Sequence, residues 1–393
     1  MNNSAASSAS IIGVTRRAAL CGLGAATTGI APIAQAVDPV VTTPEQFGAI
    51  GDGVAPDGMA LARMIEAINA TAGRGRVEVV CRGRYLMRGA PRRAPAPTHR
   101  QDKGGAVFGL PPITRDNVLI TAWGAEFVVP PEVPFRRLER GGGESDSFFV
   151  GLQFLGRGIQ MLGGLLDGNL NNRPASRGPR PLGYGGDEYA LVMEGEDWLL
   201  DRVSARDWGT DCLLIGSTGR SHGGTYTGAR RNCVSVVATT PISPERPVVI
   251  EGGVMRDAAD WPDWLYNNPG AGIDVEGTAA ASVILRGIDF SGNRLKDVQI
   301  SKEAHDCVVE YCTIRNRLLL RPLQRGGHVI RHNVFDGEAP FVRISETFAD
   351  NKNILIEDNT CVNDGSLIVF HGSRVPEAVA RQRIVLSVNR GCQ

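Results

Sequence analysis

The stretch Leu285-Arg-Gly-Ile-Asp-Phe290 belongs to a six-residue phrase to which the chain keeps returning. The phrase has an aliphatic residue, two polar or small residues, then in most copies Asn, Gly or Cys, then an outward position and another apolar residue. The later copies start about 20 to 30 residues apart, a spacing typical of a coiled repeat and not of a helix bundle. The other clear copies are Val309–Ile314, Ile330–Phe335 and Ile356–Cys361, and fainter ones start at Ile250, Leu200, Met161 and Ile120.

The repeated phrase predicts a solenoid. One copy is too short to bury its own apolar face, so it must stack on its neighbours with alternate apolar residues pointing into a shared core. The 49 glycines and the low aromatic content of 6% also favour many short strands joined by turns. We therefore expect an all-β fold in a single domain, residues 37–393.

One amphipathic helix is expected near the start of that domain. Asp57 can cap a run of apolar residues at helical spacing from Met59 to Ile68, and Gly73 stops it. A solenoid needs its first coil covered, because an open end presents unpaired strand edges. This helix would provide the cover.

The segment around this helix carries a family resemblance. Phe47-Gly-Ala-Ile-Gly-Asp-Gly53, the helix, and a Gly-rich strand that ends at Tyr85 resemble the opening segment of pectate-lyase-superfamily proteins. These are right-handed parallel β-helices related in fold to pectate lyases and polygalacturonase-type glycoside hydrolases. The resemblance covers most of the chain and implies such a β-helix, with residues 37–85 as opening segment and capping helix. It does not fix the activity, since the fold hosts lyases, hydrolases, epimerases and binders.

The first 36 residues are predicted to be an export signal. Arg16-Arg17 precedes an apolar run that reaches Ile33, and Ala34-Gln-Ala36 is a small-residue cleavage site. The pattern resembles a twin-arginine signal, with an ordinary secretory signal as the alternative. Both predict a periplasmic or secreted protein. The run is too short and Gly-rich to span a membrane, and no later segment approaches about 20 apolar residues.

The charge balance and the cysteine spacing argue against a nucleic-acid partner, a disulfide framework and a zinc site. Removal of residues 1–36 would take away Arg16 and Arg17 and leave 40 basic against 42 acidic residues, a balance that argues against nucleic acid. It would also leave seven of the eight cysteines, at scattered spacings that fit neither a disulfide framework nor a zinc site. One disulfide is compatible with this pattern, and its pairing stays open.

Three insertions rich in Arg, Pro and Gly interrupt the early coils, at Arg88–Arg100, Arg136–Arg140 and Arg173–Arg180. If strands stack in register, loops at the same point of successive coils emerge on one side. Their arginines, Arg173 among them, could then wall a groove for a polyanionic sugar. The alternative is three solvated loops with no common purpose.

The segment Arg206–Gly216 is the first candidate for chemistry. It resembles the Gly-Asp-Asp-Cys-x-x-x-Gly stretch of polygalacturonase-type hydrolases, with Asp211 retained and Thr210 in place of the first aspartate. Asp207 stands three residues earlier. A hydrolase of this type needs one carboxylic acid for the leaving oxygen and another carboxylate for water, so the replacement puts hydrolysis in doubt. Trp208 is a candidate for binding substrate.

His222, beside two glycines, resembles the Gly-His-Gly stretch of the same hydrolases, with a turn histidine as the alternative. Arg230-Arg231-Asn232 resembles a phrase of superfamily members with mostly unassigned substrates. Because adjacent residues of a strand face opposite ways, only one of the two arginines can point into a given groove.

Asp274 and Glu276 lie two residues apart on a predicted strand and so share a face. Carboxylates paired in this way are costly unless a metal, an arginine or a substrate proton uses them. Solvation or ion pairs with Arg231 or Arg256 are the alternative. The aromatic residues that could stack on sugar rings are Trp261, Trp264 and Tyr266.

These residues predict a polysaccharide, acidic if the arginines line the groove, as the partner. The favoured function is a lyase acting on a uronate-containing chain, with Arg230 or Arg231 on the substrate carboxylate or proton and His222 as acid or base. A hydrolase using Asp207 and Asp211 and a non-catalytic carbohydrate binder are the alternatives. No cofactor is certain; a calcium ion is the one metal considered, with Asp207, Asp211, Asp274 and Glu276 as ligands.

Overall fold

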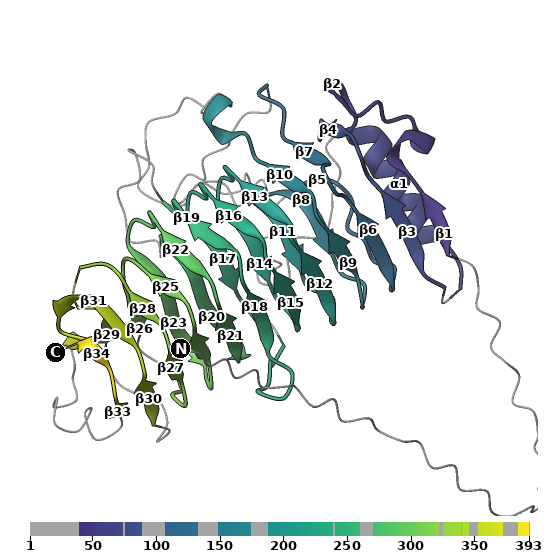
Figure 1. Cartoon of the computed structure of the whole chain (residues 1–393). Coiled ribbons are helices and arrows are strands. Elements are labelled where there is room, and N and C mark those ends of the chain that lie inside the picture. The colour runs from purple at the N-terminus through teal and green to yellow at the C-terminus, as the bar shows by residue number, and fades with distance from the viewer. Residues whose placement is uncertain are drawn as a thin grey trace, which may run out of the picture. The chain divides into compact units, whose positions relative to one another are not determined.

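The computed structural model describes residues 39–73, 75–88, 107–132, 148–173, 188–238, 240–259, 270–321, 325–338, 340–345, 353–371 and 384–392. Residues 38–393 form one compact unit (Figure 1). The predicted export signal lies outside the described residues.

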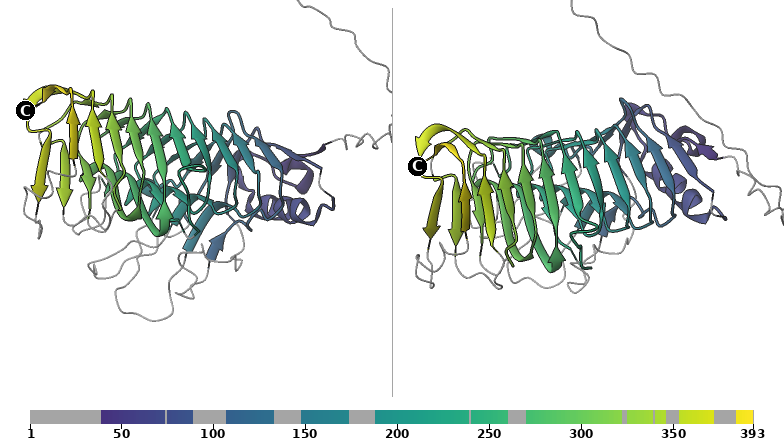
Figure 2. Two further views of the ribbon diagram at one scale, coloured as in Figure 1. Left: turned by 90° about the horizontal axis from the view of Figure 1, so that it is seen from below. Right: turned by 60° about the horizontal axis from the view of Figure 1, so that its bottom comes forward.

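The unit is a right-handed parallel β-helix, which confirms the predicted fold class. The described strands form three parallel sheets, here named A, B and C, with 12, 12 and 10 strands, and successive coils stack along the solenoid (Figure 2). The first coil has helix α1 (Gly58–Ala70) after its sheet B strand and no described strand in sheet C. Because every described strand pairs in parallel with the next coil, backbone hydrogen bonds run along the whole stack.

Sheet A contains β1 (Val40–Thr42), β3 (Val77–Val80), β6 (Val118–Thr121), β9 (Gln160–Leu162), β12 (Trp198–Asp201), β15 (Gly219–His222), β18 (Val248–Glu251), β21 (Val283–Arg286), β24 (Val308–Glu310), β27 (Val329–Arg331), β30 (Ile354–Glu357) and β33 (Ile384–Ser387). Sheet B contains β2 (Asp52–Pro56), β4 (Arg84–Leu86), β7 (Glu126–Val128), β10 (Leu165–Asp167), β13 (Ser204–Arg206), β16 (Thr225–Thr227), β19 (Val254–Arg256), β22 (Asp289–Ser291), β25 (Thr313–Ile314), β28 (Val334–Phe335), β31 (Thr360–Gly365) and β34 (Arg390–Cys392). Sheet C contains β5 (Val107–Gly109), β8 (Phe148–Phe154), β11 (Glu188–Met193), β14 (Asp211–Ile215), β17 (Asn232–Val236), β20 (Ala271–Ala281), β23 (Lys296–Ala304), β26 (Leu318–Leu320), β29 (Val342–Ser345) and β32 (Ile368–His371).

The repeated phrase is the passage from a strand of sheet A, through a turn, into a strand of sheet B. Its first residues are in register from Met161 to Ile356. Leu200 and Ile250 start copies that are about twice the usual spacing apart, because a whole coil lies between them. In that coil Ser221 occupies the position of the first aliphatic residue. The Ser221 hydroxyl lies 3.0 Å from the hydroxyl of buried Tyr226, and this hydrogen bond satisfies both groups inside the core.

The asparagines of the later copies have a structural role in the same turn. Asn333 and Asn359 are buried, and each donates its side-chain amide to a backbone oxygen of sheet A. Asn359 Oδ1 also accepts the backbone N–H of Asn333 over 3.0 Å, and Asn389 repeats this contact with Asn359. This ladder satisfies turn groups that would otherwise be buried without partners.

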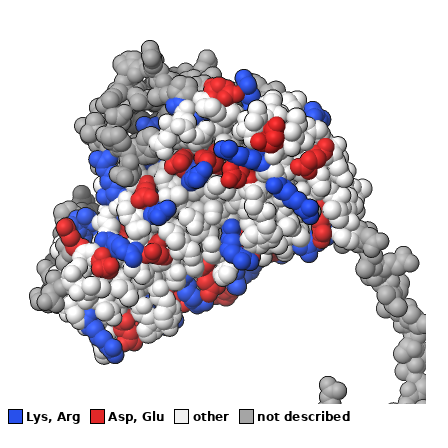
Figure 3. Space-filling model, turned by 45° about the horizontal axis from the view of Figure 1, so that its top comes forward, with Lys and Arg blue, Asp and Glu red and all other residues white. Residues whose placement is uncertain are grey.

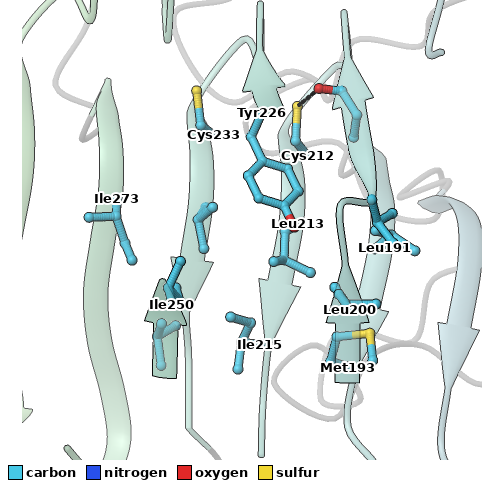
Figure 4. Packing of buried hydrophobic residues seen from close by; sticks show 14 of the residues in the cluster. Leu191, Met193, Leu200, Cys212, Leu213, Ile215, Tyr226, Cys233, Ile250 and Ile273 are labelled. Atoms are coloured by element: carbon cyan, nitrogen blue, oxygen red, sulfur yellow. Dashed lines mark hydrogen bonds between the residues drawn. The ribbon is translucent and has the colours of Figure 1, made fainter. Parts of the chain in front are cut away.

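The core lies between the three sheets. Leu200 and Ile250 of sheet A, Tyr226 of sheet B and Leu213 and Ile273 of sheet C all point inward and pack together (Figure 4). Truncation of one such aliphatic side chain to alanine typically costs about 2 to 5 kcal/mol.

Helix α1 (Gly58–Ala70) lies at the N-terminal end of the solenoid, as predicted (Figure 2). Leu61, Ile65 and Ile68 are buried in the solenoid core. Asp57 holds the N-cap position, but its side chain makes no capping hydrogen bond. Instead Asp57 Oδ1 accepts the backbone N–H of Ile50 over 2.7 Å and thus ties the preceding turn to the helix.

One disulfide joins Cys361 of β31 to Cys392 of β34, next to each other at the end of sheet B. The other described cysteines are buried free thiols: Cys81, Cys212, Cys233, Cys307 and Cys312. They fill core positions as small apolar groups.

The long insertions share one corner of the solenoid. The connections β4–β5, β7–β8, β10–β11 and β19–β20 each lead from a strand of sheet B to a strand of sheet C. The first three of these connections contain the Arg-rich insertions Arg88–Arg100, Arg136–Arg140 and Arg173–Arg180, which apart from Arg88 and Arg173 lie outside the described residues. Within the described ranges, no helix is both long and apolar enough to cross a membrane.

Candidate functional site

Four of the predicted catalytic residues meet on the outer face of sheet C. Asp211 opens β14, Arg231 directly precedes β17, and Asp274 and Glu276 lie on β20. Their neighbours Ile273 and Val275 are core residues, so Asp274 and Glu276 point outward. We name the sheet C cluster by its six residues: Asp211, Arg231, Asp274, Glu276, Lys296 and Gln299.

Arg231 and Asp211 form a buried ion pair. Arg231 Nε donates to Asp211 Oδ1 over 2.8 Å, and its Nη2 donates to the other carboxylate oxygen. Asp211 is fully buried, and the backbone N–H of Asn232 donates to it over 3.1 Å. This two-point contact fixes the plane of the guanidinium. Arg231 is therefore held as an oriented cation and is not suited to act as a base.

Asp274, Gln299 and Lys296 form a continuous hydrogen-bonded chain. Lys296 Nζ donates to Gln299 Oε1 over 2.7 Å, and Gln299 Nε2 donates to Asp274 Oδ1 over 2.6 Å. Strand pairing places Asp274 beside Gln299 in neighbouring coils, with Lys296 at the start of the same strand β23. All three side chains are buried.

Burial moves the pKa values of both ends of this chain toward neutrality. It raises the pKa of Asp274 to about 7, with the negative charge of Glu276 acting in the same direction and Arg231 against it. It lowers the pKa of Lys296 to about 8, opposed by the attraction of Asp274. Groups that titrate near neutral pH are suited to proton transfer and often mark functional sites.

Glu276 forms the more exposed side of the cluster. Its side chain is 25% exposed and lies 3.1 Å from Lys302 Nζ, which is 50% exposed. Asp274, two residues earlier on the same face of the strand, is buried.

Lys296 and Gln299 were missed by the sequence analysis. Lys296 is one of only four lysines after the predicted signal in a chain whose basic residues are otherwise arginines, and that was the one available signal. Neither residue lies in a recognisable phrase; the stacking of β23 on β20 brings them to Asp274.

His222 lies on another sheet, so the prediction that it joins Asp211 and Arg231 is wrong. It ends β15 of sheet A, and its Nδ1 lies 3.0 Å from Asp201 Oδ1 of β12. The same outward row continues through charged side chains that pair between coils, such as Arg286 and Arg331 with Glu310. Figure 3 shows acidic and basic side chains intermixed over the face in view.

Asp207 is also separated from the cluster. It follows β13 of sheet B in a left-handed turn conformation (φ 57°). Burial raises the pKa of its carboxyl, and its nearby like charges are Asp167 and Asp257. Asp211 is paired with Arg231 instead, so the structure does not present Asp207 and Asp211 as a joint acid and base.

Two predicted substrate contacts are buried structural groups. Trp208 has no exposed surface and donates its indole N–H to the backbone oxygen of Leu166 over 3.1 Å. Arg173 has a fully buried side chain that forms a two-point ion pair with Glu188 at 2.8 and 2.9 Å. Both side chains are thus engaged in contacts within the fold, where the sequence predicted contacts with substrate.

Arg230 and Arg231 both lie in the turn before β17, and both are buried. Arg231 forms the ion pair with Asp211. Because both arginines precede β17, the alternation of a strand does not decide their directions. The predicted aromatic platform of Trp261, Trp264 and Tyr266 lies outside the described residues.

A calcium site finds no support in the described coils: no three Asp, Glu, His or Cys side chains there gather so that they could hold a metal ion. Asp207, moreover, is placed on a different sheet from its proposed co-ligands. The acidic residues of the cluster are matched by Arg231, Lys296 and Lys302 instead.

Similar structures support the fold. No protein-family model matches the chain, and no curated protein matches its sequence. The A-module of mannuronan C-5 epimerase AlgE4 from Azotobacter vinelandii is 15% identical, with 88% of this chain and 94% of that one covered and a TM-score of 0.50. The catalytic domain of Agl-KA is 12% identical, with 91% and 54% covered and a TM-score of 0.49.

A third similar structure is PfbA, a surface adhesin of Streptococcus pneumoniae, which is 12% identical, with 89% and 91% covered and a TM-score of 0.46. At such identities the likeness shows the architecture alone. The chain is thus a right-handed parallel β-helix protein.

Proposed function

We propose that the chain is an exported protein that acts on a uronate-containing polysaccharide at the outer face of sheet C, by lyase-type elimination. The observation that carries this proposal is the chain Lys296–Gln299–Asp274, with its hydrogen bonds of 2.7 and 2.6 Å. Its ends have pKa values of about 8 and about 7. Between these values Asp274 is mostly ionised and Lys296 mostly protonated.

That charge state suits abstraction of a proton next to a carboxylate. The Asp274 carboxylate takes the proton from the ring carbon that bears the uronate carboxylate. The electron pair forms a carbon–carbon double bond, and the glycosidic carbon–oxygen bond breaks. Lys296 donates the proton that the leaving oxygen needs. Arg231, fixed by Asp211, supplies positive charge to the substrate carboxylate.

The disulfide Cys361–Cys392 supports the export part of the proposal, since such bonds persist in oxidising compartments.

A non-catalytic binder is the second candidate, and a specific observation favours it. Every acidic group of the sheet C cluster has a partner: Asp211 has Arg231, Asp274 has Gln299, and Glu276 has Lys302. A fully matched cluster can serve as a recognition surface without chemistry.

The test is incubation of the protein with polygalacturonate, alginate and a neutral glucan. Elimination gives an unsaturated uronate that absorbs in the ultraviolet, whereas hydrolysis gives reducing ends without that absorbance. We expect the ultraviolet signal with a uronate polymer, and a loss of about 100-fold or more in Asp274→Asn. Asp289→Asn, an exposed carboxylate of sheet B, is the matched control.

Reducing ends without ultraviolet absorbance would replace elimination by hydrolysis. Binding of the polymer without either signal would favour the second candidate.

A further inference from the structure

A depression of about 540 Å³ lies on the outer face of sheet A, away from the sheet C cluster. It spans the neighbouring strands β12, β15, β18 and β21. The segment before β18 forms one wall, where Arg246 Nη2 contacts Asp197 Oδ1 over 2.7 Å and ties this segment to β12. The depression is thus built by contacts between coils.

The floor of the depression is apolar. Val249 and Ile284 are paired across β18 and β21, and both are half-buried. The buried Trp198 also lines the space, beside Gly219, where a Cβ atom would lie only 2.2 Å from the indole ring. Aliphatic floors of this kind suit the C–H face of a sugar ring.

One cation in the depression is unpaired. Arg286 contacts Glu310 and Glu251, and Arg246 contacts Asp197. Arg220 is exposed and stands beside Val249 in the sheet, and among the described residues it makes no hydrogen bond or ion pair. A free guanidinium can bind a carboxylate through two parallel hydrogen bonds.

Acidic side chains complete the rim. Glu245 and Glu251 line the depression, with Glu245 exposed and Glu251 half-buried. Carboxylates accept hydrogen bonds from sugar hydroxyl groups. The combination of one free arginine, an apolar floor and acidic acceptors matches a sugar that carries a carboxylate, hydroxyl groups and an apolar ring face.

We propose that this depression is a second, non-catalytic binding site for a carboxylated sugar. Arg220 binds the carboxylate, Val249 and Ile284 contact the ring, and Glu245 and Glu251 accept hydrogen bonds from its hydroxyl groups. The site holds an acidic polymer on sheet A, a different face of the coil from sheet C. It does not depend on the chemistry proposed for sheet C.

The test is calorimetric titration with a tetramer of galacturonate and, as the neutral probe, maltotetraose. The titrations are carried out in wild type and in Asp274→Asn, so that heat released by substrate turnover is not taken for heat of binding. We expect Arg220→Gln to weaken the binding of the galacturonate tetramer at one site by about 10-fold or more. The change removes the positive charge and the two parallel N–H donors of the guanidinium. Arg84→Gln, an exposed arginine of sheet B, is the matched control and should leave binding unchanged.

Val249→Glu is the second variant, since it places a carboxylate beside Arg220 where the ligand would compete for it. Loss of the same sites in both variants, with unchanged circular dichroism, supports the proposal. Unchanged binding in both variants overturns it. Equal competition by inorganic phosphate also overturns it, because the depression would then be a simple anion site. A protein without lyase activity leaves this result intact, so failure of the two proposals can be told apart.

Discussion

Gln299 donates its side-chain amide to Asp274 over 2.6 Å from the neighbouring coil, and both residues are 1% exposed. The oxygen of the same amide accepts a hydrogen bond from Lys296. Gln299 thus fixes the distance between an acid and a base that titrate about one pH unit apart.

Gln299→Met should change the pH dependence of activity. The hydrogen bond from Gln299 lowers the pKa of Asp274, so its loss raises that pKa further. If Asp274 is the base, the acid limb of the kcat profile moves to higher pH, and kcat falls about 10-fold or more at neutral pH with little change in KM. The readout is the pH profile of both constants.

Gln160→Met on sheet A is the matched control for this change. An unshifted profile in Gln299→Met would mean that Gln299 does not position Asp274.

Asp274→Asn should flatten the dependence of stability on pH. Because the folded-state pKa is raised, the folded protein binds more protons than the unfolded chain between about pH 4 and about pH 7. Its stability therefore falls as pH rises through this window, by up to about 1.4 kcal/mol per unit, and levels off above it. The asparagine variant lacks this contribution.

Urea unfolding at a series of pH values from 4 to 8 measures the slope. The same slope in Asp274→Asn and in wild type would show that Asp274 is ionised throughout.

Tyr226→Phe and Ser221→Val should each cost about 1 to 3 kcal/mol, because each leaves the other hydroxyl buried without its partner. The double variant should cost less than the sum, since it removes both polar groups and restores the aliphatic pattern of the repeat. A double-mutant cycle in urea gives the coupling. Strict additivity would show that the two hydroxyls do not share a hydrogen bond.

Arg173→Met should destabilise the fold by about 3 to 5 kcal/mol, because it leaves Glu188 buried and unpaired. Arg173→Met combined with Glu188→Met should recover much of this loss, as apolar replacement of a whole buried pair often does. Thermal unfolding compares the three variants. A stable single variant that only loses affinity for polymer would restore the sequence-based role of Arg173 in substrate binding.

Much of the fold follows from the sequence, because its signals are local. The solenoid is predicted by inward side chains at every second residue, by the turn and by the repeat length of one coil. The prediction holds even though Ser221 replaces the aliphatic residue in one copy. The position of α1 was also predictable, from apolar spacing between Met59 and Ile68. The hydrogen bond of Asp57 was not predictable, because its carboxylate accepts the backbone N–H of Ile50 in the preceding turn and does not cap the helix.

The candidate site was predicted only in part. The structure places Asp211, Arg231, Asp274 and Glu276 on, or directly before, neighbouring strands of sheet C, because their phrases fall at the same point of neighbouring coils. His222 was misplaced because the short coil from Ser221 to Asn232 passes through all three sheets, so nearness in sequence did not mean one face. Trp208 and Arg173 looked accessible, but packing buried both.

The sequence by itself determined that the chain coils, where its strands alternate and where its insertions interrupt them, since these depend on residues close together in the chain. The tertiary structure alone decided which side chains of different coils meet. The pairing of β20 with β23 places Asp274 beside Gln299, and burial moves the pKa values of Asp274 and Lys296 toward each other. No local pattern contains the contact between Asp274 and Gln299 or the burial of both residues, because these depend on coils about 20 or more residues apart.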